Sequence, residues 1–161
     1  MMENTIVKLS WEDVEKNIEK LANKIKMDGF EADYIIGIMT GGLIPLGLLV
    51  KKLNMDKILT VSAGSYEKNK QKELAITYLP EVDLSGMKIL LIDDIADTGI
   101  TLNKVSQAII CKYNIGELKT ASLVMNKRNC NFFPDFFAIS VDKWVIFPWN
   151  KEEFPEYFTK T

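Results

Sequence analysis

The 161 residues and 18.3 kDa of this chain fit one globular domain, for which 47% hydrophobic and 26% charged residues are typical. A formal net charge of −2 provides no general positive field for nucleic acid. The absence of histidine excludes Ser-His-Asp and Cys-His catalysis and every His-ligated metal site. Cys111 and Cys130 form no CxxC pair, so they predict no zinc or redox motif.

The N-terminal segment has no apolar run behind a basic start, so we expect no signal peptide and a cytoplasmic protein with two reduced thiols. Residues 34–50 are uncharged and approach the length of a short membrane span. Several glycines and Pro45 interrupt them, however, which favours a buried strand, a loop and a helix. We therefore expect no membrane contact.

The elements predicted along the chain alternate between helix and strand. Ser10 and Asp13 are spaced like a capping box, and they precede apolar residues at helical spacing that end near Gly29. Further helices are expected from about Pro45 to Lys52 and over 101–113, and strands over 34–39, 58–62, 88–92, 118–125, 136–141 and 144–147. The polar residues 65–73 are expected to form an exposed, mobile loop. The pattern predicts an α/β fold, an open, mostly parallel twisted sheet flanked by helices, whose ligands lie beyond the carboxyl ends of the strands.

The segment most informative about chemistry is ILLIDDIADTGITL, residues 89–102. An apolar strand leads to Asp93 and Asp94, whose carboxylates suit Mg²⁺ or sugar hydroxyls. The following turn opens a helix, whose first N–H groups, with the hydroxyls of Thr98 and Thr101, suit a phosphate monoester. Alternatively, Asp97 or Thr98 only caps the helix.

This segment resembles the phosphoribosyl pyrophosphate (PRPP) binding signature of the type I phosphoribosyltransferases. The resemblance implies PRPP contacts from Asp93, Asp94, Asp97, Thr98, Gly99, Ile100 and Thr101. It also implies that Asp97 is the general acid or base at purine N7.

The glycine-rich segment MTGGLIP, residues 39–45, resembles the pyrophosphate-binding loop of bacterial xanthine–guanine enzymes. Glycine permits close backbone approach to a ligand. The resemblance implies pyrophosphate contacts at Thr40, Gly41 and Gly42. Thr40 stands where the family usually has arginine, so a charge-assisted contact is missing. An ordinary strand-to-helix turn is the alternative.

Residues 65–75 are similar to the flexible loop that closes over the active site in these enzymes, with Ser65 and Tyr66 near the pyrophosphate. Closure of such a lid excludes water from the reaction. A solvated, charged loop without this role is the alternative.

Residues 126–150 resemble the small base-binding hood of the 6-oxopurine members. By this resemblance, Lys127 donates to the oxygen on purine C6 and Trp144 stacks on the ring. The backbone around Val145 and Ile146 meets the opposite edge of the base. The alternatives are a surface cation and a half-buried core aromatic.

Taken together, the resemblance implies one phosphoribosyltransferase-like domain over residues 1–161 that acts in purine salvage. The enzyme would transfer ribose 5-phosphate from PRPP to guanine, hypoxanthine or xanthine. It implies Mg²⁺ near Asp93, Asp94 and Asp142, and a dimer or tetramer. Another acceptor base, or a non-catalytic sensor of PRPP or nucleotide, stays open as an alternative.

Overall fold

The structure, a computed structural model, describes residues 6–68 and 71–159 and is built on a six-stranded sheet in the order β4-β3-β2-β5-β6-β7. The strands are β2 (Tyr34–Met39), β3 (Ile58–Lys68), β4 (Gln71–Tyr78), β5 (Lys88–Ala96), β6 (Glu117–Asn126) and β7 (Phe136–Val141). Neighbouring strands are parallel except β3 and β4, which are antiparallel. The open, mostly parallel sheet expected from the sequence is confirmed.

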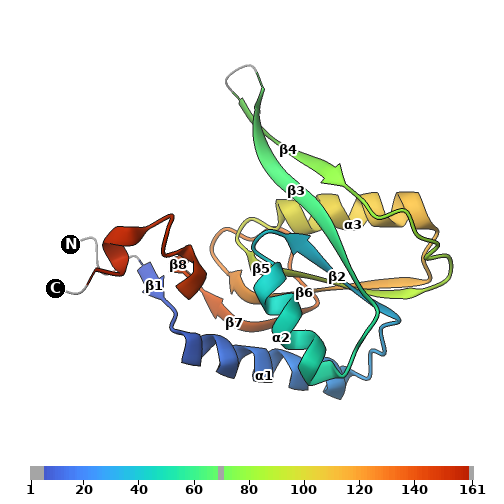
Figure 1. The fold of residues 1–161 in the computed structure, drawn as a ribbon, viewed down its shortest axis with the longest axis horizontal. Helices are drawn as coiled ribbons and strands as arrows, with labels where there is room; N and C mark the ends of the chain where they lie inside the picture. The colour runs from blue at the N-terminus through green and yellow to red at the C-terminus, as the bar shows by residue number, and fades with distance from the viewer. Residues whose placement is uncertain (1–5, 69–70, 160–161) are drawn as a thin grey trace.

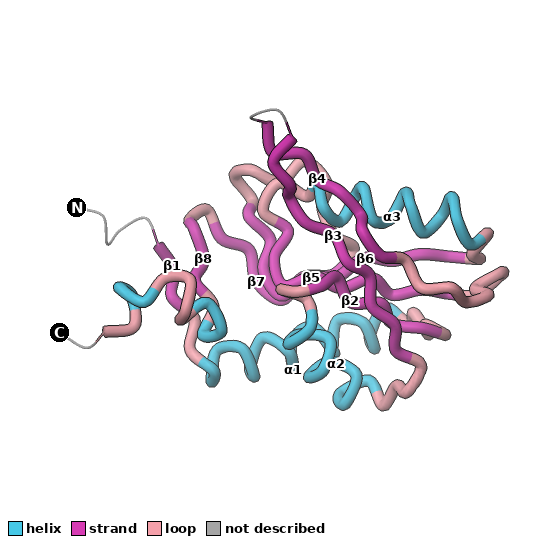
Figure 2. The backbone as a smooth tube through the Cα atoms, turned by 45° about the horizontal axis from the view of Figure 1, so that its top comes forward, coloured by secondary structure: helices cyan, strands magenta, loops and turns pink. Residues whose placement is uncertain are grey.

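Helices cover both faces of this sheet. The helices α1 (Trp11–Asp28) and α2 (Leu43–Leu53) lie on one face, and α3 (Ile100–Tyr113) lies on the other (Figure 1) (Figure 2). Ile35 and Leu90 therefore pack with α1 and α2, whereas Ile36 and Leu91 pack with α3. Burial on both faces explains why these strands are uninterrupted apolar runs.

The first helix begins and ends at the residues expected from the sequence. Ser10 accepts a hydrogen bond from the Asp13 backbone N–H at 3.1 Å, and the Ser10 backbone N–H donates to Asp13 Oδ2 at 2.8 Å. Gly29 ends the helix with a φ of +76°, a conformation that glycine adopts at little cost. These local contacts confirm the predicted capping box.

The polar segment expected to be a loop is instead part of an antiparallel hairpin. β3 runs to Lys68 and β4 starts at Gln71, with Ser65 opposite Leu74 and Tyr66 opposite Glu73. The hairpin projects away from the body of the sheet (Figure 1). Charged residues mark such a segment as exposed but do not prevent pairing at a sheet edge, where charge is common.

A second, two-stranded sheet joins the two ends of the chain. β1 (Ile6–Lys8) pairs in parallel with β8 (Trp144–Ile146), and the short helices η2 (Pro148–Asn150) and η3 (Pro155–Tyr157) follow. The strand near 144–147 is confirmed, while β1 had not been expected. Across the described residues, no helix combines the length and apolar character needed to span a membrane.

A crevice lies at the carboxyl ends of β2 and β5, because the chain continues from these two neighbouring strands to opposite faces of the sheet. β5 pairs with β2 only as far as Ile92 but with β6 as far as Ala96. α2 and α3 then pack on opposite faces, which makes this a topological switch point. The predicted strand end at Ile92 was therefore too early, and Asp93 and Asp94 lie within β5.

Candidate active site

Two adjacent carboxylates, Asp93 and Asp94, lie near the carboxyl end of β5 and line one cavity there. Asp93 is 8% exposed, and its Oδ1 accepts the Asp94 backbone N–H at 2.9 Å. Asp94 Oδ1 accepts the Ile95 backbone N–H at 2.8 Å. Among the side chains that the structure describes, those of residues 6–65 and 73–159, none forms an ion pair with either carboxylate. A cation brought by a ligand would therefore meet two uncompensated acids.

Burial shifts both acids toward the neutral form. It raises the pKa of Asp93 well above its usual range, and the Asp94 charge raises that pKa further. Burial also raises the pKa of Asp94. The Ile95 N–H and the Trp149 indole lower this pKa, but their effect is smaller than that of burial. Trp149 Nε1 is buried near Asp94 but makes no hydrogen bond to a described residue. In the ligand-free protein burial therefore disfavours ionisation of the pair, and a cation bound beside it would stabilise the ionised form.

The glycine-rich loop after β2 passes close over this acid pair. A Cβ atom on Gly41 would lie 2.5 Å from Asp94 Oδ2, and one on Gly42 would lie 2.6 Å from the Ile38 carbonyl oxygen. The peptide bond between Met39 and Thr40 is cis, and Thr40 is exposed. Gly42 is thus required by contact with the backbone of the sheet, and Gly41 by contact with the Asp94 carboxylate, while contact of both with pyrophosphate stays a prediction.

Residues 97–101, here called the phosphate turn after the role predicted for them, comprise the link between β5 and α3 and the first two residues of α3. Gly99 is the residue before the helix and has a φ of +81°. No side chain caps the helix at Gly99, although Thr98 Oγ1 accepts the Ile100 N–H at 3.3 Å. The role of Thr98 as a cap is therefore limited to one long hydrogen bond.

A small cavity, the turn cavity, opens between the acid pair and the phosphate turn. Its volume is about 190 Å³, several times the roughly 30 Å³ occupied by a water molecule in the liquid. The predicted PRPP residues that line it are Asp93, Asp94, Asp97, Thr98, Gly99 and Thr101. Ile100 is 54% exposed and does not line it. The first turn of α3 directs its N–H groups to this end of the helix, which suits an anion.

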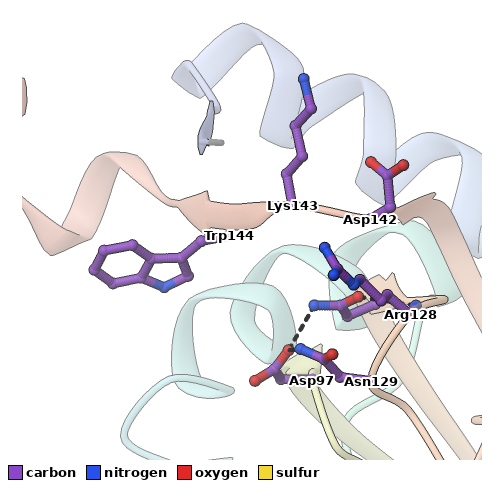
Figure 3. A pocket seen from close by; sticks show the side chains of 7 residues that line it. Asp97, Arg128, Asn129, Asp142, Lys143 and Trp144 are labelled. Atoms are coloured by element: carbon purple, nitrogen blue, oxygen red, sulfur yellow. Dashed lines mark hydrogen bonds between the residues drawn. The ribbon is translucent and has the colours of Figure 1, made fainter. Parts of the chain in front are cut away.

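A larger cavity, the hood cavity, has a volume of about 780 Å³ (Figure 3) and shares Asp97 with the turn cavity. It is lined by Asp97, Asn126, Arg128, Asn129, Asp142, Lys143 and Trp144. Trp144 is 49% exposed, and its ring forms a T-shaped pair with Phe154 at a centroid separation of 4.9 Å. The indole thus has an accessible surface and a fixed neighbour, as a stacking platform needs.

The remaining predicted base-binding residues lie around this cavity rather than in its lining. Lys127 is exposed, and its backbone N–H donates to the Val141 carbonyl at 2.8 Å. The side chains of Val145 and Ile146 are buried, and the Ile146 carbonyl accepts the Leu9 N–H at 2.9 Å. Ser65 is exposed in β3 and lines neither cavity, whereas the Tyr66 side chain lies outside the description.

The three predicted metal carboxylates are not gathered at one point. Asp93 and Asp94 line the turn cavity, whereas Asp142 lines the hood cavity and points away from Asp97 (Figure 3). In the part of the chain that the structure describes, no group of three or more acidic or cysteine side chains could hold a metal ion by itself. Most ligands of a bound cation would therefore come from substrate and water.

Sequence reasoning missed four lining residues, namely Asn126, Arg128, Asn129 and Lys143. The signal for the first three is the polar run NKRN at the carboxyl end of β6. Because β6 is the parallel neighbour of β5, that run had to lie beside the phosphate turn.

Comparison with known proteins agrees with this geometry. The family described as phosphoribosyl transferase domain matches residues 9–157. A xanthine-guanine phosphoribosyltransferase of Desulfotalea psychrophila is 31% identical over 147 residues, covering 89% of this chain and 86% of that protein. The corresponding Chromohalobacter salexigens protein is 27% identical over 143 residues, covering 88% and 82%.

Solved structures show the same fold. A purine phosphoribosyltransferase from Pyrococcus horikoshii superposes with a TM-score of 0.79 at 31% identity, covering 90% of this chain and 93% of that one. A xanthine-guanine-hypoxanthine phosphoribosyltransferase from Helicobacter pylori gives 0.83 at 21% identity, covering 96% and 99%, which supports the fold alone. The site geometry and the match over nearly the whole chain lead to one conclusion: this chain belongs to the phosphoribosyltransferase family.

Proposed function

We propose that this protein is a purine salvage phosphoribosyltransferase that transfers ribose 5-phosphate from PRPP to a 6-oxopurine and releases pyrophosphate. The observation that carries the proposal is the position of Asp97, which lines both the turn cavity and the hood cavity. A sugar phosphate in the first cavity and a base in the second would meet at this carboxylate. The names of the similar proteins support the same assignment.

The phosphate turn would hold the 5-phosphate of PRPP. Thr98 and Thr101 contribute hydroxyl donors, and the first N–H groups of α3 contribute further donors at the positive end of the helix. The loop at Gly41 and Gly42 would face the pyrophosphate; because the Gly42 N–H already donates to the Ile38 carbonyl oxygen at 2.9 Å, the backbone donor to the ligand would be the N–H of Gly41.

The hood cavity would hold the base. Trp144 would stack on the purine ring, and the ammonium of Lys127 would donate to the oxygen on C6. An ammonium cannot accept a hydrogen bond, so it favours a 6-oxo group over the 6-amino group of adenine. Asp97 would hold or release a proton at purine N7 as the bond to ribose forms.

We propose that Mg²⁺ is required. Asp93 and Asp94 fit a bound cation because they are adjacent acids without an ion-pair partner among the described side chains of residues 6–65 and 73–159. They would hold it with PRPP, and Asp142 would contribute through water. When bound, Mg²⁺ neutralises the developing charge on pyrophosphate.

The decisive experiment supplies PRPP and Mg²⁺ with guanine, hypoxanthine, xanthine, adenine, orotate or uracil, and measures nucleotide and pyrophosphate. We expect products from 6-oxopurines, and none after chelation of the metal. Asp93→Asn combined with Asp94→Asn should abolish turnover, whereas Asp56→Asn, an exposed carboxylate outside both cavities, is the control.

Two alternatives have distinct outcomes in this experiment. Product from adenine, orotate or uracil alone would assign another acceptor base. Binding of PRPP or nucleotide without product from any base would favour the sensor. We further propose a cytoplasmic homodimer or homotetramer, which light scattering after gel filtration would test.

A further inference from the structure

The carboxylate of Asp97 is held from one side by amide groups. Asn126 Nδ2 donates to Asp97 Oδ1 at 2.7 Å (Figure 3). Asn129 Nδ2 reaches the same oxygen at 3.5 Å, the outer limit for a hydrogen bond. The two donors are not equivalent, because Asn126 is 4% exposed whereas Asn129 is exposed. The buried Asn126 is therefore the principal contact of Asp97.

The orientation of the Asn126 amide is itself fixed by the following turn. Asn126 Oδ1 accepts the Arg128 backbone N–H at 3.0 Å, and its main-chain carbonyl accepts the Cys130 N–H at 2.9 Å. A flipped amide would place its oxygen against the Asp97 carboxylate and its NH₂ group against the Arg128 N–H. Both contacts would be repulsive, so the amide has one satisfied orientation.

The two oxygens of Asp97 consequently differ. Both amides act on Oδ1, while no described side chain of residues 6–65 and 73–159 and no described backbone N–H donates a hydrogen bond to Oδ2. Asp97 is exposed and lies on the turn between β5 and α3. The hydrogen bond from Asn126 is thus the main restraint on where Oδ2 points.

We propose that Asn126 is a positioning residue that fixes Asp97 Oδ1 and leaves Oδ2 available for the proton at the purine. The inference rests on the proposed function, in which Asp97 is the acid or base. An amide suits this task because it donates without carrying a charge and does not titrate, so it does not exchange protons with Asp97. A carboxylate restrained in this way is poised for proton transfer, which depends on geometry first.

The discriminating variant is Asn126→Asp. It retains an oxygen for the Arg128 N–H, so the turn is preserved, but it replaces the NH₂ donor with an acceptor facing Asp97. At pH 8 we expect kcat to fall by about 10- to 100-fold with the KM for PRPP within about threefold, because only the reacting geometry is lost. The protein should remain folded by circular dichroism.

The pH profile separates positioning from a structural effect. Burial and the neighbouring Asp97 raise the pKa of the introduced carboxyl group, and its protonated form donates as the amide does. The deficit relative to the wild-type profile should therefore shrink as pH falls. Arg128, Asp142 and Lys143 face the same cavity in both proteins, so the side chain at 126 is the difference between the two profiles. Asn23→Asp makes the same charge change on the exposed surface of α1 and is the matched control.

Wild-type kcat in Asn126→Asp, an equal deficit at every pH, or a rise in KM that parallels the fall in kcat would each overturn the proposal. A crystal structure of Asn126→Leu provides a second readout that does not depend on activity. We expect Asp97 to turn away from residue 126 in that variant, and an unchanged Asp97 orientation would refute positioning. An inactive wild-type protein would count against the proposed function instead, and the crystal structure would still decide this inference.

Discussion

Replacing Gly99 by alanine tests whether the phosphate turn depends on its contact with the segment after β6. A Cβ atom on Gly99 would lie 2.5 Å from the Phe132 carbonyl oxygen and 2.8 Å from Phe132 Cβ. Because the nearest atom belongs to the backbone, rotation of a side chain cannot relieve the contact. The left-handed conformation adds a cost of about 1–2 kcal/mol, and overpacking adds about 1–3 kcal/mol.

We therefore expect Gly99→Ala to lower the free energy of unfolding by about 2–5 kcal/mol. Gly86→Ala is a matched control, because Gly86 has a φ of +72° and nothing within 4 Å of an added Cβ. It should show only the backbone cost. For a chain of this size, each kcal/mol corresponds to about 2–4 °C in Tm, which thermal unfolding by circular dichroism resolves.

Gly99→Ala should also weaken the binding of PRPP at the phosphate turn. The Asn131 N–H donates to the Thr98 carbonyl at 3.0 Å, so displacement of Phe132 disturbs the phosphate turn directly. We expect the KM for PRPP to rise in Gly99→Ala and not in Gly86→Ala. Equal losses of Tm in the two variants would refute the packing argument, and an unchanged KM in Gly99→Ala would separate the turn from PRPP binding.

Three further predictions concern the acid pair and the hood. Burial raises the pKa of Asp94 in the folded protein above its value in the unfolded chain. At neutral pH the ionised carboxylate therefore lowers the free energy of unfolding. This loss of stability disappears as the pH falls below the folded and then the unfolded pKa of Asp94. Asp94→Asn should therefore raise Tm in metal-free buffer at pH 7, with a gain that shrinks toward acid pH; a gain that grows toward acid pH would contradict this. Trp149→Phe keeps an aromatic ring stacked on Phe147 but removes the indole N–H that lowers the pKa of Asp94. The pKa of Asp94 should rise, and the acid limb of the kcat/KM profile should move to higher pH. An unmoved acid limb would exclude that contact. Lys127→Gln should reduce discrimination between 6-oxo and 6-amino purines, whereas Trp144→Leu should weaken every base with the order preserved; kcat/KM for guanine, hypoxanthine, xanthine and adenine distinguishes the two.

Local signals in the sequence were sufficient for the elements that carry most of the site. Ser10 and Asp13 lie three residues apart, so their reciprocal hydrogen bonds depend on nothing distant in the chain. The apolar run of β5, its acids and the turn at Gly99 are likewise contiguous. The order of strand, turn and helix, and with it the turn cavity, could therefore be predicted.

Elements that depend on distant partners were missed or misread. β1 has three residues and pairs with β8, which is more than 130 residues away in the sequence, so no local sequence pattern predicts this strand. β4 is an edge strand whose polar residues resemble a loop, and only its pairing with β3 gives it a fixed conformation. Strand formation of this kind is decided by neighbours rather than by propensity.

The sequence by itself determined the fold class, the phosphate turn and the acid pair, because these follow from periodicity and from residues adjacent in the chain. Tertiary structure decided which side chains face one another across the site. Asn126 and Asp97 are 29 residues apart, and their hydrogen bond exists because β6 lies in register beside β5. Asp142 was separated from Asp93 and Asp94 for a related reason, since it follows β7, two strands away from β5. Strand order sets such distances, and strand order is fixed by packing of the whole sheet.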